Sequence, residues 1–157
     1  MTRPIVAVVG GHRCSPGEAE LAEAVGRGLA AAGAVVLCGG LGGVMEAAAR
    51  GAKSVAASLT VGILPGDDPA AANRYIDVPI ATGMGEMRNA LIVRAAQAVI
   101  AIGGGWGTLS EIALARRIGR PVVGLADAFS PGVDIPRVTS PAEAVAHALA
   151  HTGADSA

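Results

Sequence analysis

The chain has 157 residues, of which 52% are hydrophobic and only 2% aromatic, and its formal net charge is −1. This length predicts one domain, residues 1–157, with a core built from Ala, Val, Leu and Ile. The balanced charge argues against a nucleic-acid or acidic membrane surface, and the apolar stretches are too short to span a bilayer. Because the first residues also lack a signal-peptide pattern, we expect a cytoplasmic protein.

The first half of the chain alternates short β-branched runs with Ala-rich stretches. This alternation is typical of a parallel sheet covered by helices. The hydrophobic patterns predict strands at residues 5–9, 34–38 and 59–64, and helices at 17–32 and 44–56.

The second half continues the same pattern after a loop at 65–74. We expect, in chain order, an edge strand at 75–78, a three-turn helix at 84–96, a strand at 98–102, a helix at 108–118, a strand at 121–125 and a helix at 141–151. Residues 126–139 are predicted to form a loop with at most one short strand, and the tail from about 152 to be frayed.

The order of these elements predicts a Rossmann-like, doubly wound α/β fold, with a mostly parallel sheet and helices on both faces. Right-handed crossovers place the first three strands on one side of strand 5–9 and the later strands on the other. Strands 5–9 and 98–102 then meet at the switch point, where ligands of such folds bind. Both strands end in glycines, namely Gly10 and Gly11 after the first and Gly103, Gly104 and Gly105 after the second.

The segment GGGWGTLSE, residues 103–111, combines a strand end, a glycine loop and a helix start. Glycine amides and a helix N-terminus attract phosphate, although such a turn also serves simply to pack a strand against a helix. Thr108 and Glu111 have the spacing of a capping box. Alternatively, Glu111 faces the crevice, where it could bind ribose hydroxyls or act as an acid or base.

Two further segments could join this site. Arg88 falls near the start of its predicted helix, where a cation opposes the helix dipole. It either pairs with Glu86 or with solvent, or it neutralises a ligand phosphate. The loop CGGLGG repeats the arrangement of strand, glycine turn and helix. Either it brings Gly39, Gly40 and Gly42 to the same edge of the sheet as the other two loops, or it is simply a tight turn between a strand and a helix.

Several function classes lack their motifs in this chain. No G-x-G-x-x-G follows a strand, and neither a Walker A loop nor a G-x-S-x-G elbow is present, which argues against dehydrogenases, ATPases and serine hydrolases. His12 and Cys14 are too few ligands for a metal, so we predict no metal site. Cys14 and Cys38 are expected to be free thiols, although both follow strands whose ends could be neighbours and bridge.

The motifs GGLGGVMEAAARGA, VGILPG, GMGEMRN and GGGWGTLSEIALA have the order and approximate spacing found in the SLOG superfamily, which the chain resembles over nearly its whole length. That superfamily includes the Lonely Guy phosphoribohydrolases, proteins once labelled lysine decarboxylases, and molybdenum cofactor carrier proteins. GMGEMRN together with GGGWGTLSE looks closest to the carrier-like subgroup.

Lonely Guy enzymes carry the motifs P-G-G-x-G-T-x-x-E and M-x-x-R-K. The resemblance implies that Arg88 and Glu111 would be catalytic if this chain were such an enzyme. It differs from the enzymes in having Gly103 for Pro, Asn89 for Lys, and Ser110 where many have a second Glu. These departures favour binding over hydrolysis.

The leading hypothesis is therefore a protein that binds a nucleoside monophosphate or a molybdopterin-type cofactor and needs no other cofactor. The rival hypothesis is a nucleoside 5′-monophosphate phosphoribohydrolase of the cytokinin-activating type. The predicted binding residues are Gly10, Gly11, Gly39, Gly40, Gly42, Arg88, Asn89, Gly103, Gly104, Gly105, Trp106, Gly107, Thr108 and Glu111.

The aliphatic character of the chain also predicts a homo-oligomer, either a dimer or a tetramer, because a small domain of this composition hides apolar surface between subunits. The helix that contains Leu91, Ile92 and Val93 is the predicted interface. No nucleic acid or membrane partner is expected.

Overall fold

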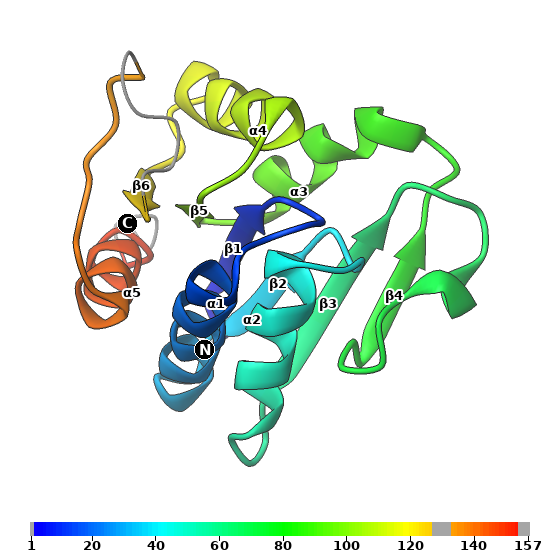
Figure 1. The fold of residues 1–157 in the computed structure, drawn as a ribbon, viewed down its shortest axis with the longest axis horizontal. Helices are drawn as coiled ribbons and strands as arrows, with labels where there is room; N and C mark the ends of the chain where they lie inside the picture. Colours follow the sequence, from blue (N-terminus) through cyan, green and yellow to red (C-terminus); the bar gives the residue numbers. More distant parts are fainter. Residues whose placement is uncertain (1, 127–132, 154–157) are drawn as a thin grey trace.

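The computed structural model describes residues 2–126 and 133–153, and these form a six-stranded sheet between two layers of helices (Figure 1). The strands are β1 (Ile5–Gly10), β2 (Val35–Cys38), β3 (Leu59–Leu64), β4 (Val78–Ala81), β5 (Ala98–Ile102) and β6 (Val122–Leu125). The helices are α1 (Pro16–Ala31), α2 (Val44–Lys53), α3 (Asn89–Ala95), α4 (Trp106–Arg117) and α5 (Pro141–Ala150), with short 3₁₀ turns η1 (Pro69–Ala71) and η2 (Gly85–Arg88).

The sheet is parallel throughout, in the order β4-β3-β2-β1-β5-β6. β1 lies between β2 and β5, with Val9 opposite Ala101 and Gly10 opposite Ile102. The chain therefore changes direction of winding between β1 and β5, which confirms the predicted doubly wound fold. Because all strands run the same way, the loops after them gather at one edge of the sheet.

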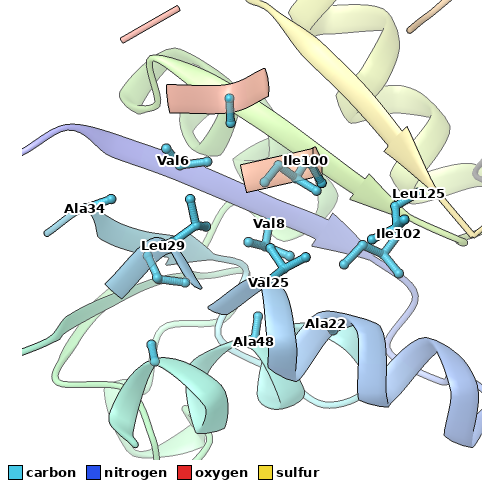
Figure 2. Close-up of a cluster of buried hydrophobic side chains, with 14 of the residues drawn as sticks. Val6, Val8, Ala22, Val25, Leu29, Ala34, Ala48, Ile100, Ile102 and Leu125 are labelled. Atoms are coloured by element: carbon cyan, nitrogen blue, oxygen red, sulfur yellow. The ribbon is translucent and has the colours of Figure 1, made fainter. Parts of the chain in front are cut away.

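Alternate residues of β1 enter two separate cores. Val6 and Val8 pack with residues of α1, α2 and α5 on one face, and Figure 2 shows this cluster. Ala7 and Val9 pack with α3 and α4 on the other face. Since both faces of the central strands are buried, their sequences are almost continuously apolar rather than alternating with polar residues.

Helices α1 and α2 approach one another so closely that glycine is required at their contact. A Cβ at Gly26 would lie 1.9 Å from the carbonyl oxygen of Ala48, and one at Gly51 would lie 1.9 Å from that of Glu23. α1 begins with a capping box between Ser15 and Glu18, which satisfies its first amides.

Two predicted elements after β3 were placed wrongly. The edge strand begins at Val78 rather than Tyr75, because the carbonyl of Tyr75 and the side chain of Asp77 bind Thr60 and so stand outside the ladder. The helix predicted at 84–96 is instead the 3₁₀ turn η2 followed by α3. Gly85 has a φ of +59°, which an α-helix cannot include.

Helix α4 begins two residues before its predicted start, with Gly105 as the N-cap, so Thr108 and Glu111 do not form a capping box. Of the three residues in the predicted interface helix, Ile92 and Val93 are core residues of the monomer, whereas Leu91 is exposed. α2 ends at Lys53, before its predicted end at Ala56.

Part of the predicted loop at 126–139 and most of the predicted frayed tail lie outside the described residues, which exclude 127–132 and 154–157. The described part of that loop makes a single bridge, between Arg137 and Gly124. No helix among the described residues is long and apolar enough to cross a membrane.

Candidate ligand-binding site

A cavity of about 220 Å³ opens at the carboxyl ends of β1 and β5. Three glycine loops meet there, and they contribute Gly10 and Gly11 after β1, Gly39 and Leu41 after β2, and Gly105 to Gly107 after β5. The turn from η2 into α3 closes a further side. The loops after β1 and β5 thus lie against one cavity, as their positions in the sequence suggest.

The loops after β1 and β2 are held against each other by backbone contacts. Val44 N donates to Gly11 O at 3.0 Å, and a Cβ at Gly43 would lie 2.2 Å from the same oxygen. Gly43 also has a φ of +64°. Glycine at position 43 therefore fixes the relative position of these two loops.

The N-terminus of α4 points unpaired amides toward this region. The helical ladder starts with Leu109 N donating to Gly105 O at 3.0 Å, and no side chain caps the N-terminus. The amides of Trp106, Gly107 and Thr108 consequently have no partner within the helix. With the helix dipole, they supply roughly half a positive charge to the cavity.

Arg88 is buried, with only 6% of its surface exposed, and it lines the cavity. Its Nε donates to Ile63 O at 2.8 Å and its Nη1 to Asn89 Oδ1. Among the described residues it forms no salt bridge with Glu86, and it is not a solvated surface residue. A Cβ at Gly39 would lie 2.7 Å from Nη2, so glycine there leaves room for the guanidinium.

Glu111 is 7% exposed and also lines the cavity. Its carboxyl group has no hydrogen-bond partner within the described part of the chain. Burial raises its pKa to about 8; Arg88 partly offsets this rise, and Glu86 adds to it. At neutral pH the carboxyl is therefore mostly protonated, and it can donate a hydrogen bond or a proton to a ligand.

Asn89 and Ser110 form a neutral bridge between α4 and the first residue of α3. Asn89 Nδ2 donates to Ser110 Oγ at 3.2 Å, and Ser110 Oγ donates to Gly107 O at 2.6 Å. Two of the positions at which the sequence differs from the Lonely Guy motifs, 89 and 110, are thus in direct contact.

The structure brings most of the predicted residues to the cavity but not all of them. Those that line it are Gly10, Gly11, Gly39, Arg88, Asn89, Gly105, Trp106, Gly107, Thr108 and Glu111. Gly103 and Gly104 lie instead beside the start of α1. Gly103 N donates to Leu125 O, at the end of β6, at 3.3 Å. Gly40 and Gly42 also lie outside its lining, and Gly40 O accepts from Asn73 N.

Sequence reasoning missed several residues of the lining, including His12, Leu41, Met45, Glu86 and Ile92. His12 directly follows Gly11, and this position could have indicated it, but it was weighed only as a metal ligand. Apolar residues such as Met45 and Ile92 carry no signal that separates a cavity wall from core.

Both cysteines are free thiols. Cys38 is fully buried next to the site, where burial raises its pKa to about 11. Within the described residues, no group of three or more His, Cys, Asp or Glu side chains could hold a metal ion.

Comparison with known proteins points to one family. The model of the SLOG cluster4 family matches residues 3–153. The structure is similar to that of a molybdenum cofactor binding protein from the phototrophic bacterium Rippkaea orientalis, with 37% identity, a TM-score of 0.86 and coverage of 96% of this chain and 97% of that chain. It is also similar to the molybdenum cofactor carrier protein of Chlamydomonas reinhardtii, with 30% identity, a TM-score of 0.81 and coverage of 92% and 95%. An uncharacterized protein from Archaeoglobus fulgidus is 45% identical over 120 residues, which are 76% of this chain and 78% of that protein.

Proposed function

Because the chain belongs to the SLOG cluster4 family, we propose that its cavity binds a phosphate-bearing cofactor of the molybdopterin type and that the protein acts as a carrier. The observation that carries this proposal is the meeting, in one cavity, of the unpaired amides of α4 with the buried side chains of Arg88 and Glu111. The similarity to molybdenum cofactor binding and carrier proteins supports the choice of ligand.

The phosphate group would sit at the N-terminus of α4. There it would accept hydrogen bonds from the amides of Gly107 and Thr108, with Gly10 and Gly11 forming the opposite wall. A bound anion would satisfy donors that α4 leaves open and would gain from the helix dipole. Arg88 would add a full positive charge from a position that its bond to Ile63 O already fixes.

Glu111 suits this role because its carboxyl is mostly neutral at pH 7, with a pKa of about 8. An ionised carboxylate would repel the phosphate, whereas a protonated one can donate a hydrogen bond to a ring nitrogen or oxygen of the cofactor.

Trp106 would hold the ring system of the cofactor. Its side chain is 85% exposed although it lines the mouth of the cavity. Leaving so much of the indole in contact with water is unfavourable, and a flat heteroaromatic ring of a ligand can cover it by stacking on its face.

A charge placed in the phosphate position tests the proposal. A Cβ at Gly107 has room, because its nearest neighbour, Glu86 Oε2, is 3.9 Å away. The helix dipole favours an acidic residue in this first turn and offsets the repulsion from Glu86, so Gly107→Asp, checked for folding by circular dichroism, should fold but repel the ligand. Gly17→Asp is the matched control, since Gly17 occupies the same helical position in α1 and lies outside the cavity lining.

The assay mixes the purified protein with molybdenum cofactor released from a molybdoenzyme and measures, by gel filtration and mass spectrometry, how much cofactor the protein retains. We expect retention by the wild type and by Gly17→Asp, and loss in Gly107→Asp. Equal retention by all three proteins would place the phosphate elsewhere, and no retention by any of them would contradict the proposed function.

Hydrolysis of a nucleoside 5′-monophosphate is the second candidate function, and the protonated state of Glu111 favours it. A buried carboxyl with a pKa of about 8 could protonate the base as the N-glycosidic bond breaks. Release of adenine from AMP would reveal this activity, and Glu111→Gln should abolish it while binding remains measurable. If Glu111→Gln kept the wild-type rate, Glu111 could not be the acid.

We also propose that the protein self-associates through the face formed by β4, η2 and α3. Large apolar side chains are exposed there, namely Val78, Ile80, Met84, Met87 and Leu91. β4 is an edge strand, so its outer side is also unpaired. Sedimentation equilibrium should give a dimer or tetramer for the wild type and a smaller species for Met87→Glu; a monomeric wild type would refute this arrangement.

A further inference from the structure

A second cavity, of about 250 Å³, lies at the opposite edge of the sheet from the candidate site. Its walls are the C-terminal end of α4, the segment that enters β6 at its amino end, and the last turn of α5. Within residues 2–126 and 133–153, no carboxylate lines it and four basic side chains do, namely Arg116, Arg120, His147 and His151.

Two of these side chains contain a buried nitrogen without a hydrogen-bond partner, namely Arg120 Nε and His147 Nδ1. The only side-chain hydrogen bond that Arg120 makes within the described residues is from Nη2 to Arg94 O, at 3.1 Å. An unsatisfied buried polar atom of this kind costs about 1–3 kcal/mol. Such a cost indicates that the cluster lacks a partner.

A structural explanation would be that these cations cap the helix ends beside them. The end of α4 is already closed by its own backbone, because Gly119 N donates to Arg116 O at 3.2 Å and Arg120 N to Ala115 O at 2.8 Å. At the end of α5, His151 Nδ1 lies 2.8 Å from His147 O and Thr152 Oγ1 donates to Leu149 O at 2.9 Å. Arg120 Nη2 caps a third helix, because Arg94 O belongs to the last turn of α3, but its buried Nε is not used by any of these helix ends.

No acidic residue neutralises this cluster either. Neither Arg116 nor Arg120 forms a salt bridge within the part of the chain that the structure describes. Burial lowers the pKa of His147, and the neighbouring ring of His151, whose centroid is 4.9 Å away, lowers it further. Two guanidinium charges outweigh the roughly half negative charge at each of the two helix ends.

We propose that this second cavity binds a small oxyanion of the size of phosphate, at a site separate from the cofactor cavity. A volume of about 250 Å³ is sufficient for one oxyanion. Arginine side chains suit it because the guanidinium fork binds two oxygens of a phosphate at once.

The three histidines of the chain allow both cavities to be followed in one titration. His12 lines the cofactor cavity, whereas His147 and His151 line the second cavity. Inorganic phosphate is added at fixed pH, with chloride adjusted to keep the ionic strength constant, while the imidazole resonances are recorded by NMR. We expect saturable shifts of the His147 and His151 resonances, whatever His12 does.

Arg116→Gln tests the role of the arginines without disturbing the core, because Arg116 is exposed. It should weaken phosphate binding at His147 and His151 at least about tenfold. Arg117→Gln is the matched control, since it removes the adjacent exposed arginine of the same helix, which does not line the cavity. Arg120→Gln, checked for folding by circular dichroism, should weaken binding as well.

Shifts that fail to saturate, or that are equal in Arg116→Gln and Arg117→Gln, would overturn the proposal. This outcome is distinct from failure of the proposed cofactor function, which His12 and the cofactor retention assay report.

Discussion

Two polar clusters of this protein differ in whether their carboxyl groups find hydrogen-bond partners within the protein. Near the start of β4, the Asp77 carboxylate accepts from Lys53 Nζ at 2.8 and 3.0 Å, from Thr60 N at 2.9 Å and from Thr60 Oγ1 at 3.1 Å. At the candidate ligand cavity, the Glu111 carboxyl has no such partner within the described residues, although it is the more buried of the two.

The pKa values of the two carboxyl groups shift in opposite directions as a result. Burial alone would raise the pKa of Asp77, but the hydrogen bonds from Lys53 and Thr60 outweigh it and lower the pKa. Burial without hydrogen bonds raises the pKa of Glu111 to about 8. The Asp77 carboxylate is thus satisfied within the fold, whereas the Glu111 carboxyl lines the candidate cavity with its hydrogen-bonding capacity unused.

The largest expected effect is on the pH dependence of stability, tested with Glu111→Gln. Between pH 4.5 and about 8 the folded protein keeps the Glu111 proton while the unfolded chain has lost it. The free energy of unfolding therefore falls as pH rises through this window, by up to about 4–5 kcal/mol. Urea denaturation at pH 5 and pH 9 should show this fall in the wild type and a much smaller one in Glu111→Gln.

If the two proteins instead lost stability in parallel, Glu111 would not be protonated in the folded state, and the contrast with Asp77 would disappear. Burial also lowers the pKa of His147, but this histidine is present in both proteins, so its effect cancels in the comparison.

The next largest effect concerns the hydrogen-bonded cluster of Asp77, Lys53 and Thr60. Asp77→Ala should lower the free energy of unfolding at pH 7 by about 2–3 kcal/mol, because Thr60 N and Lys53 lose their acceptor. Cofactor retention should be unchanged in this variant, measured under conditions where it is folded. Loss of retention with wild-type stability would mean that the Asp77 cluster also serves the ligand.

Trp106→Ala should weaken cofactor binding without changing stability, the reverse of what is expected for Asp77→Ala. The affinity for the cofactor should fall about tenfold, as expected for loss of one stacked ring, while the stability changes by less than about 0.5 kcal/mol because the indole is exposed. Trp106→Phe should retain most of the affinity. Equal affinity of the wild type and Trp106→Ala in a fluorescence-independent assay such as calorimetry would rule out stacking.

The smallest effect is expected from Lys53→Met. Its ion pair with Asp77 is about one-third exposed on each side, and such pairs contribute only about 0.2–1 kcal/mol. A loss as large as that in Asp77→Ala would show that the ion pair, and not the hydrogen bonds to Thr60, holds the cluster together.

The sequence predicted the parts of this structure that depend on local pattern. Apolar runs ending in glycine identified β1 and β5 and their meeting at the switch point. Residue type and the superfamily motifs identified Arg88 and Glu111, but not their burial, which depends on how η2 and α4 pack over the carboxyl edge.

What the sequence could not predict depends on contacts between distant segments. The start of β4 is set by the bonds of Asp77 to Thr60, which is 17 residues earlier. The spacing of Thr108 and Glu111 fits a capping box, but the helix begins before both of them. The basic residues of the second cavity come from α4, from α5 and from the segment that enters β6, so no local motif predicts this cavity.

The central claim is that the first amides of α4 receive the phosphate of the cofactor. The most direct measurement is an NMR titration of ¹⁵N-labelled protein with the molybdenum cofactor, following the backbone amides of Trp106, Gly107 and Thr108. The account predicts that these three resonances shift saturably, and that those of Gly17 and Glu18, at the capped start of α1, do not. Saturable binding that leaves the three α4 amides unmoved would contradict it.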